Sequence, residues 1–197
     1  MPLLALGYPA LAHLGVWLNN LHLQWLALVW LLTFSLWGAL SQRRAWAWSL
    51  LTISSIVLYW LTMHGNGLYV LYIPPIVIPL SMLLLFAGSL RPGSTPLISR
   101  VAESMRGEPL PDVLRVYTRQ VTWLWCIVSG AMLASAVIAT IWASAPVWSL
   151  IVNVIHYIVL GAVFALEFAY RRRHYGHLEP WNFAQFIRRL AQTRLRQ

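Results

Sequence analysis

Three polar side chains recur at helical spacing in an otherwise apolar stretch near the end of the chain. Asn153 and His156 are one turn apart, and Glu167 follows after eleven residues, close to three turns, so the three share one helical stripe. If this stripe faces other helices, it serves either interhelical hydrogen bonding or a ligand cavity with a catalytic role. Glu167 has a further structural alternative, because Arg171 at i+4 is placed for a helical ion pair.

The other reactive residues do not assemble into a recognisable site. Cys126 is the only cysteine, which excludes an internal disulfide and any multi-cysteine metal site. Measured from the arginine-flanked ends of their stretches at 1.5 Å per residue, Cys126 lies about 8 Å deep and His156 about 21 Å deep. This mismatch rejects a nucleophile–base pair, and Cys126 is expected to be a buried small hydrophobe. Without haem-ligand spacing, HExxH motifs or phosphate loops, we expect no metal and no cofactor.

The elements that position these residues are predicted membrane spans. Of the 197 residues, 59% are hydrophobic and only 10% are charged, whereas an ordinary soluble domain has about 25% charged residues. A sixteen-residue stretch, 3–18, either spans the membrane or is re-entrant. Five others are long enough to cross about 30 Å of hydrocarbon: 21–40, 45–63, 68–90, 121–143 and 147–170. The sequence therefore predicts an all-α, polytopic membrane helix bundle with about six transmembrane helices.

The arginines predict the orientation of these spans. All fourteen basic residues are arginines, and they outnumber five acidic residues. Arginines occur in 41–44, in 91–120 and after 170, whereas the alternate connections 19–20, 64–67 and 144–146 contain none. Because basic residues in short loops stay in the cytoplasm, the N- and C-termini are both predicted to be cytoplasmic if the first stretch spans. The net charge of +9 does not indicate nucleic acid, because no water-soluble domain carries it.

This orientation divides the chain into four parts. Residues 1–90 hold the first four spans, 91–120 an arginine-rich cytoplasmic loop, 121–170 the last two spans, and 171–197 a basic amphipathic tail. In the loop, apolar residues at helical spacing predict a helix over 97–105, which 107–111 ends before Asp112 caps the next helix.

The tail predicts an interfacial helix. Apolar residues recur at i, i+3, i+4 and i+7, and arginines lie off that stripe; these membrane-surface residues are Phe183, Phe186, Ile187, Leu190, Arg188 and Arg189. This pattern places the apolar face in the headgroup boundary and the arginines toward anionic lipid.

The positive cytoplasmic face has two explanations. Topology control with attraction to anionic lipid accounts for it without any protein partner. Alternatively, it is a docking surface for an acidic soluble partner, because the guanidinium group binds carboxylate or phosphate at two points. The loop arginines that would bind such a partner are Arg91, Arg100, Arg106, Arg115 and Arg119.

The fourth stretch is predicted to be kinked or broken. Pro74, Pro75 and Pro79 remove backbone donors in its outer half. A broken helix can line a substrate cavity, which leaves a lipid carrier or flippase as one alternative. No internal repeat of the spans is visible, which weighs against a secondary transporter.

Three motifs resemble a known family. The segments SLRPGSTPLISR (89–100), YTRQVT (117–122) and EFAYRRR (167–173) are similar to those of small polytopic inner-membrane proteins of Gram-negative bacteria, encoded among aryl-polyene and xanthomonadin pigment genes. The resemblance covers roughly residues 86–178. It implies a multi-pass protein of the bacterial inner membrane in a type II polyketide-like pathway, whose chains ride on acidic acyl carrier proteins.

The resulting hypothesis is an accessory protein of aryl-polyene-type lipid assembly. It would dock acyl carrier proteins or soluble pathway enzymes at the inner membrane. A membrane-embedded acyl- or glycosyl-transferase that uses Asn153, His156 and Glu167 is the alternative from another class. The sequence leaves open whether turnover occurs, the substrate and the oligomeric state.

Overall fold

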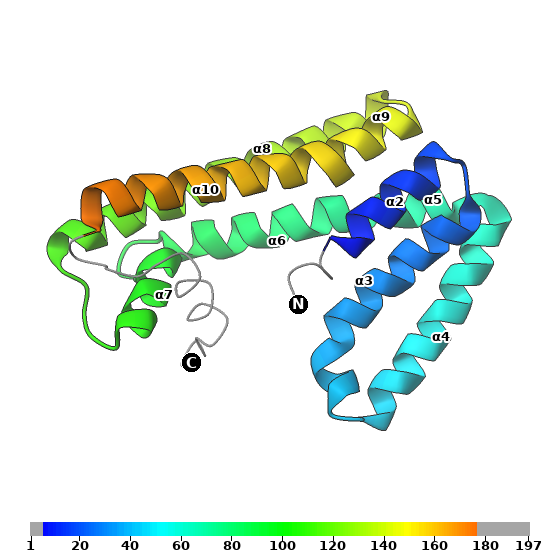
Figure 1. The fold of residues 1–197 in the computed structure, drawn as a ribbon, viewed down its shortest axis with the longest axis horizontal. Helices are drawn as coiled ribbons and strands as arrows, with labels where there is room; N and C mark the ends of the chain where they lie inside the picture. Colours follow the sequence, from blue (N-terminus) through cyan, green and yellow to red (C-terminus); the bar gives the residue numbers. More distant parts are fainter. Residues whose placement is uncertain (1–5, 177–197) are drawn as a thin grey trace. The chain divides into compact units, whose positions relative to one another are not determined.

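The computed structural model describes residues 6–176, and every regular element in that range is helical (Figure 1). In chain order the elements are α2 (Gly7–Trp17), α3 (Leu21–Ser41), α4 (Ala45–Leu61), η1 (Thr62–Asn66), α5 (Gly67–Leu71), α6 (Ile73–Ser89), α7 (Leu97–Arg106), α8 (Asp112–Trp142), α9 (Ala145–Leu150), η2 (Ile151–Ile155) and α10 (His156–Tyr175). The all-α prediction is confirmed. The predicted interfacial helix of the tail, with Phe183, Phe186, Ile187, Leu190, Arg188 and Arg189, lies outside the described residues.

Four helical stretches in the described range are long and apolar enough to cross a membrane. They are Leu21–Ser41, Ala45–Ser89, Asp112–Trp142 and Ala145–Tyr175. The second has 45 residues and covers two of the predicted spans. Helix α2 is not one of the four; its eleven residues reach only about 16 Å at helical rise. The prediction of a multi-pass membrane protein is confirmed at this level.

Large apolar side chains on the outer faces of these helices are consistent with a lipid surrounding. Ile53 and Ile56 on α4, Leu84 on α6 and Ile158 on α10 are each more than 60% exposed. Soluble monomers rarely expose contiguous apolar patches larger than a few hundred Å². In a bilayer the same side chains contact lipid tails, and no penalty for exposure to water arises.

The 45-residue stretch is interrupted twice. Gly65 has a φ of +81°, a conformation that a side chain would strain, and the chain turns there between α4 and α5. A second break falls at Tyr72, between α5 and α6. Pro74 and Pro75 then lie in the first turn of α6, where a missing N–H is tolerated. The predicted stretch 68–90 is therefore interrupted at Tyr72, just before Pro74 and Pro75, whereas α6 continues through Pro79.

The described residues form two compact units. The first unit comprises 6–77 and 134–158, and the second unit comprises 78–133 and 159–176. Helices α6, α8 and α10 each contribute residues to both.

In the first unit, α2 packs closely against α3. A Cβ atom on Gly15 would lie 2.8 Å from the backbone nitrogen of Gln24, so the absence of a side chain permits this approach. The Gln24 side chain is buried and donates a hydrogen bond of 3.3 Å to the carbonyl of Gly15. Tyr8, Ala12, Leu28 and Trp148 belong to the apolar core beside this contact.

In the second unit, α6, α8 and α10 run side by side, and α7 lies near one end of them (Figure 1). Rings connect the three long helices: Trp125 of α8 lies 6.2 Å from Phe86 and 6.2 Å from Phe164, measured between centroids.

The predicted loop helix is α7, and it ends at Gly107 in the left-handed conformation. The hydroxyls of Ser99 and Thr118, 2.7 Å apart and buried, hold α7 against α8. Helix α8 begins at Asp112, which is its first helical residue, whereas the sequence predicted Asp112 as the cap; the carbonyl of Pro111 accepts the amide of Arg115.

Candidate functional site

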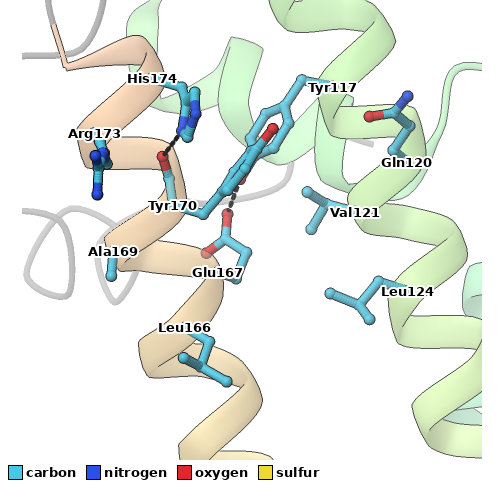
Figure 2. A pocket seen from close by; sticks show the side chains of 10 residues that line it. All are labelled: Tyr117, Gln120, Val121, Leu124, Leu166, Glu167, Ala169, Tyr170, Arg173 and His174. Atoms are coloured by element: carbon cyan, nitrogen blue, oxygen red, sulfur yellow. Dashed lines mark hydrogen bonds between the residues drawn. The ribbon is translucent and has the colours of Figure 1, made fainter.

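A pocket of about 720 Å³ lies in the second unit between α8 and α10 (Figure 2). Its lining residues are Tyr117, Gln120, Val121 and Leu124 of α8 with Leu166, Glu167, Ala169, Tyr170, Arg173 and His174 of α10. The apolar side chains Val121, Leu124 and Leu166 lie along one part of the pocket, and the titratable groups gather toward its other end (Figure 2). The pocket is therefore amphipathic along its length.

The polar end is organised around the carboxylate of Glu167. The hydroxyl of Tyr117 donates a hydrogen bond of 3.0 Å to Oε1 of Glu167, and Nε of Arg171 lies 3.4 Å from the same oxygen. The side chains of Glu167 and Arg171 are only 12% and 14% exposed, so solvent screens their interaction weakly. The predicted i, i+4 ion pair is present. Tyr117 was not predicted as its third member.

Aromatic rings cover the polar end of the pocket. The ring of Tyr170 stacks against that of His174 at 4.1 Å and against that of Tyr117 at 6.0 Å, measured between centroids. The ring of Tyr175 lies 4.7 Å from that of Tyr117. These contacts restrict the orientation of the Tyr117 ring, and hence the position of the hydroxyl that reaches Glu167. Arg173 lines the same end of the pocket as a cation.

Asn153 and His156 lie in the first unit, where each has its own partner. His156 Nε2 is 2.9 Å from the hydroxyl of Ser135 on α8, and Asn153 Nδ2 donates a hydrogen bond of 3.1 Å to Ser149 Oγ. Ser149 in turn is 3.1 Å from His13 Nδ1 on α2. Asn153 and His156 are both buried. The contact of His156 with Ser135 joins two helices and fits the interhelical alternative for this residue. The bond of Asn153 lies within the helical stretch Ala145–Tyr175, and Glu167 belongs to a separate group of contacts.

Some buried polar atoms of the first unit have no hydrogen-bond partner among the described residues. These are the hydroxyl of Tyr8, the indole nitrogen of Trp148 and Oδ1 of Asn153. An unpaired buried polar atom costs about 1–3 kcal/mol, so such atoms often mark a site of ordered water or ligand. Asn153 also lies in η2, a π-helical turn, and π-bulges occur frequently at functional sites.

An apolar pocket of about 390 Å³ lies elsewhere in the first unit. Its walls come from α3, α4 and the segment around the α5–α6 break, including Leu28, Val57, Val70 and Pro74. The broken stretch thus lines a space suited to a hydrocarbon chain, the feature that the lipid-carrier alternative requires.

The five loop arginines of the predicted docking surface all belong to the second unit. Arg106 pairs with Glu108 at 3.2 Å and Arg115 with Asp112 at 3.8 Å. Within the described range, no carboxylate lies within ion-pair distance of Arg91, Arg100 or Arg119, and all three are exposed. Arg172 and Arg173 of α10 likewise pair with no described carboxylate.

Cys126 is buried in the second unit, in agreement with its predicted role as a small hydrophobe. Among residues 6–176, no group of three or more His, Cys, Asp or Glu side chains could hold a metal ion. No family model, curated protein or solved structure matches the chain. The resemblance to pigment-cluster membrane proteins, carried by the motifs at 89–100, 117–122 and 167–173, therefore stays a prediction.

The sequence did single out Tyr117 in one way, although the spacing of polar residues along α10 says nothing about a residue of α8. Tyr117 lies within one of the motifs of the family resemblance, next to the first apolar residues of the α8 span. Its partnership with Glu167 depends on which face of α8 meets α10, and no pattern within either segment encodes that pairing.

Proposed function

We propose that this protein is a multi-pass inner-membrane accessory protein that docks acidic acyl carrier proteins and accommodates their acyl chain in the α8–α10 pocket. One observation carries the proposal: a single compact unit contains both the amphipathic pocket and the arginines that lack carboxylate partners. The family resemblance supplies the setting, which is aryl-polyene-type lipid assembly.

The charge of the second unit favours an acidic partner. Its described residues include eight arginines and four acidic residues. Three of those acids already pair with Arg106, Arg115 and Arg171. The remaining exposed guanidinium groups, among them Arg91 and Arg100, are available to the carboxylates of a carrier protein. Such groups act mainly on the rate and specificity of encounter.

The pocket suits the cargo of such a partner. Its volume of about 720 Å³ lies within the range of about 300–1,000 Å³ that small-molecule sites occupy. Val121, Leu124 and Leu166 offer an apolar wall to a hydrocarbon chain, while Glu167 and Arg173 lie at the end where a polar group would remain. The lipid bilayer and the carrier would thus both have access to the same compact unit.

The proposed topology has about six spans, with the arginine-bearing connections and both termini in the cytoplasm. The four candidate spans and the break at Gly65 support five crossings: α3, α4, α5–α6, α8 and α9–α10. The sixth requires that residues before Gly7 extend α2. The arginine distribution supports the orientation through the positive-inside rule.

Carrier binding tests the proposal directly. Full-length protein in nanodiscs is titrated with the acyl carrier proteins of its own pathway at low and high salt. Binding should weaken as salt rises and should weaken further in an Arg100→Glu variant. The matched control is Arg44→Glu, which makes the same charge change in the first unit and leaves Arg43 in its loop. Equal effects of the two variants, or binding that does not respond to salt, would contradict docking at this surface.

A second experiment tests the pocket. Leu166→Trp should fill it and reduce crosslinking from a photoreactive acyl chain, while carrier docking persists. Leu84→Trp, at a similarly exposed position on α6, is the control and should leave crosslinking unchanged. Loss of crosslinking in both variants, or in neither, would count against the pocket as the acyl site.

A transferase is the second candidate function, because the Tyr117 phenol is hydrogen-bonded to the Glu167 carboxylate in the pocket wall. An acid and a base that are hydrogen-bonded to each other, beside an apolar pocket wall for the hydrocarbon chain of a substrate, form an arrangement suited to acyl or glycosyl transfer. Pigment production separates the candidates. A transferase that depends on Glu167 predicts that Glu167→Gln abolishes pigment at normal abundance in the membrane, whereas the docking function predicts that pigment persists.

A further inference from the structure

A second pocket in the second unit combines charges of both signs. It has a volume of about 350 Å³ and is lined by Ser94, Thr95 and Pro96 of the loop before α7, Glu103 of α7, and Arg115 and Arg119 of α8. Arg115 and Arg119 are one helical turn apart, so both guanidinium groups border the same space. The pocket is distinct from the α8–α10 pocket, and no lining residue is shared.

The loop wall of this pocket is held in place by its own hydrogen bonds. The hydroxyl of Ser94 bonds to the carbonyls of Ser89 and Arg91, both at 2.8 Å. The Ser89 hydroxyl accepts a bond of 2.9 Å from the amide of Leu97, and Gly93 provides the turn with a φ of +81°. Because Ser99 also ties α7 to α8, the walls are preorganised, which favours ligand binding.

The charges in the pocket define the ligand. The guanidinium groups of Arg119 and Arg115 would bind phosphate oxygens, and arginine is suited to this by its planar fork of donors. Nη1 of Arg115 also lies 3.8 Å from Oδ1 of the exposed Asp112, so Arg115 would share its donors between that carboxylate and the phosphate. Glu103, however, would repel a simple anion, and it pairs with no arginine of the described residues. A ligand that carries an ammonium group beside its phosphate would satisfy both. The hydroxyl of Thr95 is available as an additional donor to such a phosphate.

The surface next to the pocket indicates a lipid rather than a soluble molecule. On α8, Trp123 and Ile127 follow Arg119 at i+4 and i+8, so they lie on the same face, one and two turns further along the helix. They are 54% and 66% exposed. A lipid whose phosphate contacts Arg119 can therefore lay its acyl chains along exposed apolar side chains of the same helix. Trp123 is also the residue type that concentrates at the headgroup level.

We infer that Arg115, Arg119 and Glu103 form a binding site for a phospholipid whose headgroup carries a phosphate and a primary ammonium, as phosphoethanolamine does. The two arginines hold the phosphate, and Glu103 accepts hydrogen bonds from the ammonium. This site goes beyond the proposed carrier docking and does not depend on it, because docking can use Arg91 and Arg100, which do not line this pocket.

Native mass spectrometry of the full-length protein with defined lipids tests the site. Phosphatidylethanolamine, phosphatidylglycerol and phosphatidylcholine of identical acyl chains are compared. The site predicts preference for phosphatidylethanolamine, because phosphatidylglycerol lacks the cation and the trimethylammonium of phosphatidylcholine cannot donate to Glu103. General attraction to a basic protein would instead favour the anionic phosphatidylglycerol. Equal or greater binding of phosphatidylglycerol by the unaltered protein would overturn the inference without any variant.

Variants then assign the preference to residues. Arg119→Gln should weaken phosphatidylethanolamine binding by about tenfold, the value of one charge-assisted contact. Glu103→Gln should abolish the discrimination between phosphatidylethanolamine and phosphatidylglycerol. Arg91→Gln, an arginine of the same loop outside the pocket, is the matched control and should change neither. If Arg91→Gln and Arg119→Gln act alike, this pocket is not the site.

A soluble competitor separates the lipid from its headgroup. Glycerophosphoethanolamine has the same charged groups without acyl chains, and it should displace the lipid only at far higher concentration. Competition at equal concentration would show that the apolar strip at Trp123 and Ile127 contributes nothing, which would overturn the assignment to a lipid. Failure of carrier docking with intact lipid preference would reject the proposed function and leave this site standing.

Discussion

Tyr117 and Glu167 lie fifty positions apart in the chain, yet the hydroxyl of Tyr117 donates a hydrogen bond of 3.0 Å to the Glu167 carboxylate. Arg171 contacts the same carboxylate oxygen. Oε1 of Glu167 therefore makes one contact that joins α8 to α10 and a second contact within α10, one turn along the helix. A hydrogen bond to a charged group contributes about 1.5–3 kcal/mol. This contact therefore stabilises the pairing of the two helices that form the walls of the larger pocket.

The contact between Tyr117 and Glu167 predicts energetic coupling in a double-mutant cycle. Tyr117→Phe and Glu167→Gln should each lower the free energy of unfolding in mixed micelles, and the two effects should be non-additive by about 1 kcal/mol. Tyr170→Phe is the control, because the hydrogen bond between Tyr170 and His174 uses the backbone carbonyl of Tyr170, which the substitution leaves in place. With Glu167→Gln it should give additive effects, to within about 0.5 kcal/mol. Additivity in the Tyr117 cycle would show that the bond is not formed in the protein.

The buried hydroxyl pair of Ser99 and Thr118 predicts an asymmetry between single and double variants. Thr118→Val removes one partner and leaves the Ser99 hydroxyl buried without its contact, at a cost of about 1–3 kcal/mol. Adding Ser99→Ala removes the orphaned group and should recover part of that loss. Unfolding free energies measured in micelles test this. A double variant less stable than Thr118→Val would contradict the explanation.

Gly15 predicts a packing defect that Gly130, a glycine within α8, does not share. An added Cβ would lie 2.8 Å from the backbone of Gln24, so Gly15→Ala must separate α2 from α3 at a cost of about 1–3 kcal/mol. The matched control is Gly130→Ala on α8, where no atom lies within 4 Å of the added carbon. It should be neutral or stabilise the helix by up to about 1 kcal/mol. Thermal unfolding in detergent compares the two, and equal losses would refute the close approach.

The arginine distribution predicts the result of topology reporters. Fusions at Asn66 and Ser144 should report the periplasm, and fusions at Arg43, Glu108 and Gln197 should report the cytoplasm, because the positive-inside rule places all fourteen arginines on one side. A reporter before Gly7 tests whether α2 completes a sixth crossing. A periplasmic signal at Glu108 would overturn the orientation and, with it, access of soluble carriers to the second unit.

The sequence alone determined the features that depend on neighbouring residues. The length of an apolar stretch decides whether a helix can cross the hydrocarbon, so α3, α4 and the paired segments α5–α6 and α9–α10 follow the predicted spans closely. Helix α7 was equally predictable, because helical spacing of its apolar residues and a glycine suited to left-handed backbone lie within a few positions of one another. The ion pair of Glu167 with Arg171 is local for the same reason.

Only the tertiary structure decided which polar groups meet. Spacing along one helix placed Asn153, His156 and Glu167 on a common stripe, but spacing carries no information on the helix that faces each position. That helix is set by the packing of distant segments, which brings Ser135 to His156 and Tyr117 to Glu167. The proposed lipid headgroup pocket depends on packing in the same way. Its walls come from the loop before α7, from α7 and from α8. No sequence pattern relates these three segments, and only the burial of their side chains brings them together.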